Sequence, residues 1–182
     1  LDQWLNDQPT RAIETMEKIL RENPRDTISA KLSHGIRFIL GDGNGMRRSV
    51  ERVLGAHGSD HAMRGYILGC HAFTLEETGE YAAAERTGLQ GLQYATDDAW
   101  GLHAVAHVYD MTANPDAGIQ LIEDNGAAWG HCNNFTYHVW WHKALLHLDR
   151  GELDVALALY DTKIRQDKTD DYRDIANATS LL

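Results

Sequence analysis

The chain has 182 residues, of which 43% are hydrophobic, and its formal net charge is −10. This excess of negative charge argues against a nucleic acid or an anionic membrane as partner. No run of about 18 apolar residues occurs, which excludes a membrane-spanning helix. Two cysteines, Cys70 and Cys132, lie far apart in the sequence and favour a reducing compartment, so we expect a cytoplasmic protein.

Only three prolines interrupt long stretches rich in Ala, Leu, Glu and Arg, and this composition predicts an all-α protein. The first turn of a repeating pattern of paired helices is Asp7-Gln8-Pro9. The helix after this turn runs through Leu20, and Pro24 ends it. The next turn, Gly41-Asp42, opens a helix that runs through Leu54. Each turn is followed five positions later by a small or apolar residue that can pack against a neighbouring helix.

Three further turns continue the pattern. They are Gly79-Glu80-Tyr81, Ala113-Asn114-Pro115 and Gly151-Glu152-Leu153. Gly79 and Gly151 suit the left-handed residue that follows a helix. The turn anchors near residues 7, 41, 79, 113 and 151 are therefore separated by 34, 38, 34 and 38 residues. The two longer steps place extra residues in loops at about 55–60 and 128–136.

A period of about 34 residues with two helices per unit is typical of the tetratricopeptide repeat. We therefore predict one array over residues 1–182, about five helical hairpins stacked into a right-handed α-α superhelix with a concave face. Asp26, Asp60 and Asp98 precede the first helices of three units and are expected to cap them. Incomplete units at both ends indicate a fragment of a longer chain, and exposed terminal repeats favour a homodimer through them.

The first helix of each unit lines the concave face in such arrays, which predicts a groove rich in histidine and aromatic residues. Its expected ligand-binding residues are Tyr66, Phe73, Trp100, His103, His107, Asp110, His138, Trp141 and His142, with Glu76 beside them. Histidines four residues apart share one helical face, as His103 and His107 do. Such a pair can reach one divalent metal, so we consider His103 and His107 candidate metal ligands. The purely structural interpretation, in which these are hydrogen-bonded core histidines without any cofactor, is the more common one.

Some segments also resemble a known family. Trp100–Met111 (WGLHAVAHVYDM), His138–Leu145 (HVWWHKAL) and Leu157–Asp161 (LALYD) are similar to the tetratricopeptide repeat protein 38 family and its bacterial relatives. The resemblance spans Gly65 to Asp161 and implies a cytosolic protein with divergent repeats. It implies no activity and no role for the histidines.

Two functions with a site of their own remain open from the sequence, beside a third possibility, a structural assembly segment that acts only through the rest of its chain. The first is a scaffold that binds a peptide, a protein or a small ligand in the His/aromatic groove. The alternative is an enzyme, with or without a metal, that uses the histidine pairs His103/His107 and His138/His142 as ligands or acid–base groups. No standard metalloenzyme motif such as HExxH is present, which argues against a common zinc hydrolase.

Overall fold

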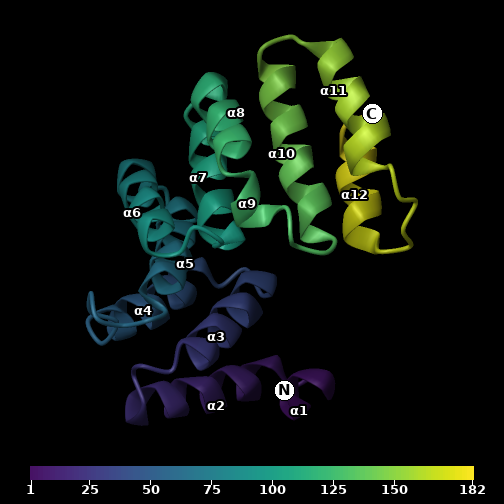
Figure 1. Ribbon diagram of the computed structural model, residues 1–182. Helices are drawn as coiled ribbons and strands as arrows, with labels where there is room; N and C mark the ends of the chain where they lie inside the picture. The colour runs from purple at the N-terminus through teal and green to yellow at the C-terminus, as the bar shows by residue number, and fades with distance from the viewer. The chain divides into compact units, whose positions relative to one another are not determined.

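A computed structural model describes residues 1–182, and its regular structure is entirely helical, which confirms the predicted fold class. The elements labelled in Figure 1 are α1 (Asp2–Leu5), α2 (Pro9–Glu22), α3 (Thr27–Ile39), α4 (Gly43–Leu54), α5 (Arg64–Glu76), α6 (Tyr81–Tyr94), α7 (Ala99–Met111), α8 (Pro115–Asp124), α9 (Gly126–Trp129), α10 (Phe135–Asp149), α11 (Leu153–Leu159) and α12 (Tyr172–Ser180). A short π-helical segment, Tyr160–Ile164, extends α11. No helix combines the length and apolar character that crossing a bilayer requires.

The chain divides into two compact units, residues 1–104 and residues 105–182. The division falls inside α7, so Ala104 is the last residue of unit 1 and Val105 is the first of unit 2. Unit 1 is built from α1 to α6 and the start of α7, and unit 2 from the rest of α7 through α12.

Five residues with positive φ mark the turns between paired helices: Asp7 (55°), Gly41 (70°), Gly79 (82°), Ala113 (52°) and Gly151 (74°). At Gly79, its N–H donates to the Glu76 carbonyl (2.9 Å) and the next N–H donates to the Leu75 carbonyl (2.8 Å). The other four turns have the same two hydrogen bonds. This is the Schellman arrangement, which satisfies carbonyls at the end of a helix and needs one left-handed residue. The expectation for Gly79 and Gly151 is confirmed.

The predicted helix caps have different outcomes. The Asp26 side chain accepts from the backbone N–H of Ser29 (3.1 Å), so the predicted cap of α3 is confirmed. Asp98 directly precedes α7, as expected. The prediction for Asp60 was wrong, because α5 begins at Arg64. Turn hydrogen bonds occupy the residues before it, from the N–H of His61 and of Arg64, and the Asp60 side chain pairs instead with Arg25 (3.6 Å).

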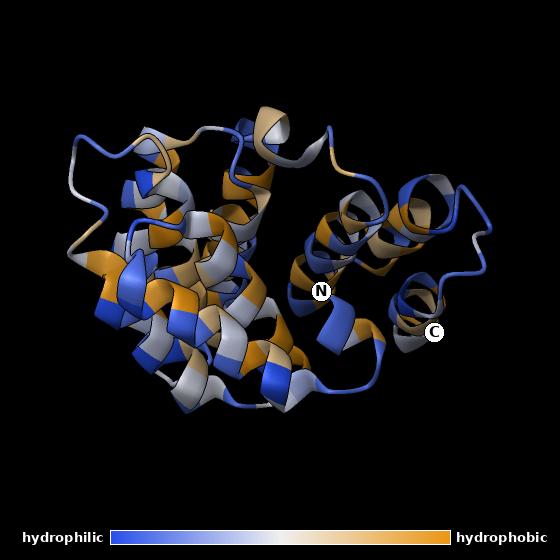
Figure 2. Cartoon of the chain, turned by 90° about the horizontal axis from the view of Figure 1, so that it is seen from below, coloured by the Kyte–Doolittle hydropathy of each residue, from blue (hydrophilic) through white to orange (hydrophobic).

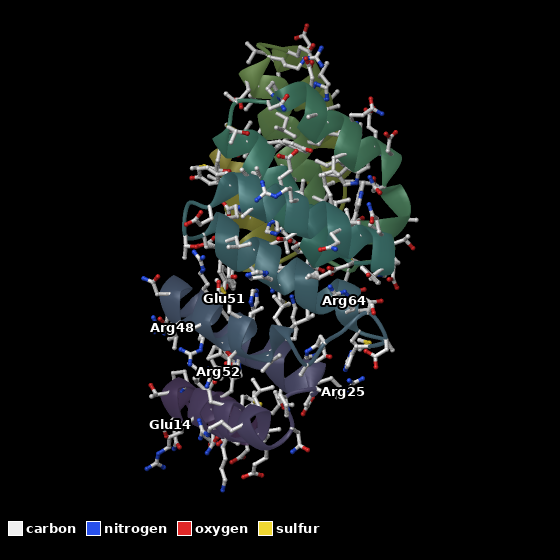
Figure 3. All side chains as sticks on the ribbon, turned by 90° about the vertical axis from the view of Figure 1, so that its left-hand side faces the viewer. Glu14, Arg25, Arg48, Glu51, Arg52 and Arg64 are labelled. Carbon is white, nitrogen blue, oxygen red and sulfur yellow. The ribbon has the colours of Figure 1, made fainter.

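The core of unit 1 is built from the apolar stripes of successive helices. One cluster joins α2 to α5 through Leu20, Ala30, Val50, Val53, Ile67 and Cys70. Glycines let α5 and α6 approach closely, since a Cβ on Gly65 would lie 2.8 Å from the Gly91 carbonyl oxygen. The opposite face of α4 is charged, and Figure 3 shows Arg48, Glu51 and Arg52 projecting from it.

A buried carboxylate also ties three helices of unit 1 together. Glu17 of α2 accepts hydrogen bonds from Ser33 of α3 (2.8 Å) and Ser49 of α4 (2.6 Å), and it pairs with Arg52 (2.7 Å). Burial acts to raise the pKa of Glu17, but these hydrogen bonds and the nearby arginines outweigh it and lower that pKa. A buried charge with this many partners is stabilised as an anion.

One part of the core of unit 2 lies among α10, α11 and α12. Its buried members are Ala144, Ala156, Ile164 and Ala178, and partly buried side chains such as Trp140 and Leu148 pack around them. Three of the four buried members are alanines, whose small side chains allow the helices to approach closely. Figure 2 shows the corresponding pattern, with orange stripes on helices and mainly blue connecting loops.

The left-handed turns lead to a paired stability test. Replacing Gly79 by Ala places a Cβ at φ 82° without any steric neighbour within 4 Å, so the expected loss is the backbone strain alone. We expect Gly79→Ala to lower the unfolding free energy by about 1–2 kcal/mol. Ala113, at φ 52°, already carries that strain, so Ala113→Gly should raise stability by up to about 1 kcal/mol. Urea unfolding followed by circular dichroism measures both, and equal signs for the two changes would contradict the explanation.

Candidate functional site

A cavity of about 260 Å³ opens in unit 1 between α3, α5 and the start of α7. Its lining residues are Thr27, Ile28, Lys31, Leu32, Met63, Tyr66, Cys70, Asp98 and Trp100. Most of these side chains are apolar, and Lys31 and Asp98 are the charged ones. Such a lining, apolar with a few placed polar groups, is typical of ligand pockets.

Trp100 forms one wall of this cavity, and contacts on the side of its ring away from the cavity fix its orientation. Its indole Nε1–H donates to Nε2 of His34 (2.9 Å), and its ring packs on Phe73 at 4.5 Å between centroids. On the cavity side, the Lys31 ammonium lies 4.0 Å from the indole centroid, a cation–π contact. The wall is therefore held rigid on one side and carries a positive charge on the other.

His34 is fully buried, and it accepts the hydrogen bond that the Trp100 indole donates. Burial lowers the pKa of His34 well below its usual value, and the nearby Lys31 charge acts in the same direction. The imidazole is therefore neutral at pH 7, and an acceptor Nε2 places its proton on Nδ1. This neutral histidine fixes Trp100 through a hydrogen bond that the protonated form could not accept.

Asp98 is the buried acid of the cavity. Its carboxylate accepts from the backbone N–H groups of Gly101 and Trp100, but its Oδ2 has no hydrogen-bond partner although the residue is only 5% exposed. Burial raises the pKa of Asp98 to about 6, partly opposed by Lys31 and the two N–H donors. A glycine on α5 makes room for the carboxylate, since a Cβ on Gly69 would lie 2.0 Å from Oδ2.

The rim of the cavity is apolar and open. Ile28 is 71% exposed and Met63 is 39% exposed. Tyr66 is held at the edge by a hydrogen bond from its hydroxyl to Asp97 (2.7 Å). A ligand that extends out of the cavity would therefore contact exposed hydrophobic side chains at its rim.

Two predicted groove residues, Tyr66 and Trp100, line this cavity. Phe73 does not, because its ring is fully buried in the core beside Met46 and supports Trp100 from behind. His103 is also buried, stacked on Phe73 at 5.7 Å with ring planes 16° apart. Glu76, at the end of α5, is buried as well.

None of the predicted site residues lies on α3, yet the sequence of α3 carries a regular signal. Tyr66, Trp100 and His138 each stand thirteen residues before a turn anchor. The same offset before Gly41 gives Ile28, and Lys31 stands ten residues before it, as His103 does before Ala113. Asp98 was recognised only as a helix cap, because a sequence does not show which of its oxygens is left without a donor.

Unit 2 holds a second cluster, in which α10 supplies His138 and His142 and α7 supplies His107. Their possible ligand atoms all lie within 4.8 Å of one another. The Nε2 atoms of His138 and His142 are 3.1 Å apart, and the rings of His107 and His142 are 4.6 Å apart between centroids. The i, i+4 spacing on α10 places both rings on one helical face.

The surroundings of the cluster orient these rings. Nδ1 of His138 lies 3.0 Å from the Asn177 side-chain amide on α12, and the ring stacks on Trp141 at 5.3 Å. Trp141 in turn donates from Nε1 to the Ser180 hydroxyl (2.9 Å). Burial lowers the pKa of His138 to about 4, and a neighbouring His107 charge would act the same way. Burial also lowers the pKa of His142 well below its usual value, so both rings are neutral at pH 7.

Two further predicted residues, His103 and Asp110, also lie on α7, on either side of His107 in the sequence. Asp110 is half-buried near the end of α7, where its carbonyl accepts from Ala113 in the turn. His103 precedes His107 by one turn on α7 and belongs to unit 1. The structure thus groups His107 with the α10 pair within unit 2, and it groups Tyr66 and Trp100 with α3 within unit 1.

Solved structures resemble this chain, although no protein-family model matches it. TTC0263, a thermophilic tetratricopeptide repeat (TPR) protein of Thermus thermophilus, has a TM-score of 0.72 at 18% identity, covering 99% of this chain and 93% of its own. MamA has a TM-score of 0.63 at 15% identity, covering 87% and 88%. A tetratricopeptide repeat protein of Parabacteroides merdae has 0.51 at 14%, covering 99% and 80%.

The chain has a TPR-type fold. Identities this low show the fold alone, so no ligand or activity is carried over from these proteins. These similar structures support the repeat class that the sequence predicted. They do not show membership of the narrower tetratricopeptide repeat protein 38 family.

The neutral state of His34 predicts a pH effect on unit 1. In the unfolded chain this histidine takes up a proton near its ordinary pKa of 6.5, whereas the folded state resists protonation to lower pH. The unfolded state therefore binds more protons, and the His34 contribution to stability is lost as pH falls below 6.5. The His34→Gln amide can still accept from Trp100 but does not titrate. Relative to this variant, the unfolding free energy of wild type should fall by up to about 1.4 kcal/mol for each unit that the pH drops below 6.5.

Urea unfolding of both proteins between pH 7 and pH 5 measures this difference. Comparing the two proteins cancels the other titrating groups, including Asp98, whose raised pKa changes stability with the opposite sign in this range. Parallel stability curves for wild type and His34→Gln would show that His34 is not kept neutral by the fold.

Proposed function

We propose that the protein is a TPR-type scaffold that binds a peptide segment of a partner protein in the cavity of unit 1. The segment places an apolar side chain against Trp100 and offers a hydrogen-bond donor to Oδ2 of Asp98. The observation that carries this proposal is that Asp98, which lines the cavity, is a buried acid whose Oδ2 has no hydrogen-bond partner.

A buried carboxylate oxygen without a donor is unfavourable, because the oxygen has lost water and gained nothing in return. The contrast with Glu17 is informative, since its Oε1 accepts from two serine hydroxyls, its Oε2 lies 2.7 Å from the Arg52 guanidinium, and its pKa is lowered. Asp98 has a raised pKa and faces a cavity instead. Buried polar groups left unmatched at a pocket are typical of sites where a ligand completes the hydrogen bonding.

A peptide fits this site better than a compact small molecule. The main chain of a peptide supplies an N–H donor at every residue except proline, and its side chains supply the apolar body that the lining favours. The exposed Ile28 and Met63 at the rim extend the contact beyond the cavity, as an extended chain requires. Concave surfaces on the first helices are also the usual binding surfaces of repeat folds.

The predicted residues of unit 1 support this proposal in different ways. Tyr66 and Trp100 contact the peptide directly, and Phe73 with His34 holds Trp100 in place. The predicted residues of unit 2 (His107, His138, Trp141 and His142) take no part in this peptide site. The tetratricopeptide repeat protein 38 resemblance agrees with a scaffold and adds no ligand.

The rim offers a matched test on a single helix. Ile28 and Ile39 are both exposed on α3, at 71% and 66%, but only Ile28 lines the cavity. A phage-displayed library of random peptides is selected on wild type, and enriched peptides are measured by fluorescence polarisation. We expect Ile28→Glu to weaken binding at least about tenfold, because the cavity mouth loses apolar contact area and gains a charge. Ile39→Glu should bind as wild type does.

Nuclear magnetic resonance locates the selected peptides independently. Amide shifts are expected in residues 27–32, 63–70 and 98–101. Peptides that bind Ile28→Glu and Ile39→Glu equally well, or that shift amides elsewhere, would overturn the proposal. A selection that enriches no peptide on wild type would also overturn it.

Asp98→Asn separates the stability and binding roles of the cavity acid. The amide keeps an oxygen for the N–H donors at the start of α7, but it carries no charge that burial disfavours. At pH 7.5 the variant should therefore unfold with a free energy higher than that of wild type by about 1–3 kcal/mol. Binding of the selected peptide should fall at least about tenfold, because a charge-assisted hydrogen bond is lost. Unchanged affinity in this stabilised variant would mean that Oδ2 does not contact the peptide.

A further inference from the structure

The histidine cluster of unit 2, made of His107, His138 and His142, has no function in peptide binding at unit 1, and its arrangement suggests another ligand. We propose that His107, His138 and His142 bind one divalent transition-metal ion of the zinc class, leaving a fourth position for water or an added ligand. This site is independent of the proposed peptide cavity.

The spacing of the α10 pair carries the argument. Two ligand nitrogens on one tetrahedral zinc ion lie about 3.3 Å apart, given zinc–nitrogen bonds of about 2.0–2.1 Å. The Nε2 atoms of His138 and His142 are 3.1 Å apart. Two facing nitrogens this close cannot both carry a hydrogen, so at least one lone pair already points into the space between them.

His107 supplies the third nitrogen from a different helix. Its ring lies 4.6 Å from that of His142, and its ligand atoms lie within 4.8 Å of those of both α10 histidines. Small side-chain rotations would close that separation onto one ion. Three imidazoles with one open position form a known zinc ligand set, and imidazole suits zinc, copper, nickel and cobalt better than magnesium or calcium.

Asn177 provides an outer-shell contact. When Nε2 of His138 binds a metal, its proton moves to Nδ1, which then needs an acceptor. The Asn177 amide lies 3.0 Å from that Nδ1, and turning the amide presents its oxygen in place of its nitrogen. Stacking on Trp141 holds the same ring in its plane. Asn177 and Trp141 together therefore fix the orientation of the His138 ring that a bound ion requires.

The alternative explanation is a metal-free hydrogen-bonded histidine cluster that only stabilises unit 2. The two explanations differ in what zinc does. A metal site takes up one ion per chain and gains stability with it, whereas a purely structural cluster does neither.

Zinc binding to the full chain, stripped with a chelator, tests the proposal. Zinc chloride is titrated in competition with a chromophoric chelator, and thermal melting is followed by circular dichroism with and without zinc. We expect one zinc per chain in the micromolar range or tighter, with a higher melting temperature. His107→Gln and His138→Gln, both half-buried, should each weaken zinc binding at least about a hundredfold and lose the thermal shift. Asn177→Ala should weaken binding by about 10–100-fold.

Two matched controls exclude other histidines. His147 lies on α10 as well, but its ring pairs with Glu152 (2.6 Å), so His147→Gln should bind zinc as wild type does. The loop pair His131 and Cys132, whose side chains are 3.8 Å apart, is removed by His131→Ala/Cys132→Ser without effect on zinc. His142 is buried, so it is tested by His142→Gln only if its metal-free melting curve matches wild type.

The proposal is overturned if wild type takes up no zinc. It is also overturned if the loop double variant abolishes binding, or if His107→Gln and His138→Gln fold and bind zinc like wild type. Peptide affinity of Ile28→Glu and Ile39→Glu does not enter these outcomes, so failure of the peptide site leaves the metal test intact.

Discussion

Each helical hairpin of this protein depends on a single left-handed residue between its two helices. A Schellman turn reverses the chain with two hydrogen bonds, and it does so only where one residue accepts φ near 50–80°. Glycine meets this requirement three times, while Asp7 and Ala113 meet it at the cost of strain. Because the turn residue fixes where one helix ends and the next begins, it also fixes which residues of each first helix stand at equivalent positions.

That register links the turns to both candidate sites. The residue thirteen positions before the anchor is Ile28, Tyr66, Trp100 or His138, and all four lie at a candidate site in their own unit. In unit 1 these positions build an apolar cavity with one buried acid. In unit 2 the same position begins the histidine pair of α10. Equivalent backbone positions therefore carry different chemistry in the two units.

Buried charges show how differently one fold can treat similar groups. Glu17 joins three helices because hydroxyl and guanidinium donors surround it, and its charge supports the packing of α2, α3 and α4. Asp98 begins a helix but leaves one oxygen unmatched, in a space that Gly69 keeps open. The first arrangement is typical of a structural residue, and the second is typical of a residue whose partner comes from outside the chain.

The helical class and the two-helix period followed from the sequence, because turn glycines and the spacing of small residues are local signals that need no tertiary information. The same period singled out Tyr66 and Trp100, which line the cavity of unit 1. The cap assigned to Asp60 was wrong because its loop forms turns that delay α5 until Arg64, a choice that local propensity does not reveal.

Only the tertiary structure decided the rest. It buried Phe73 and His34 behind Trp100, left Oδ2 of Asp98 without a donor, and brought His107 to the histidines of α10. These outcomes depend on contacts between helices far apart in the chain, whose distances and hydrogen-bond partners are properties of packing and not of any single segment.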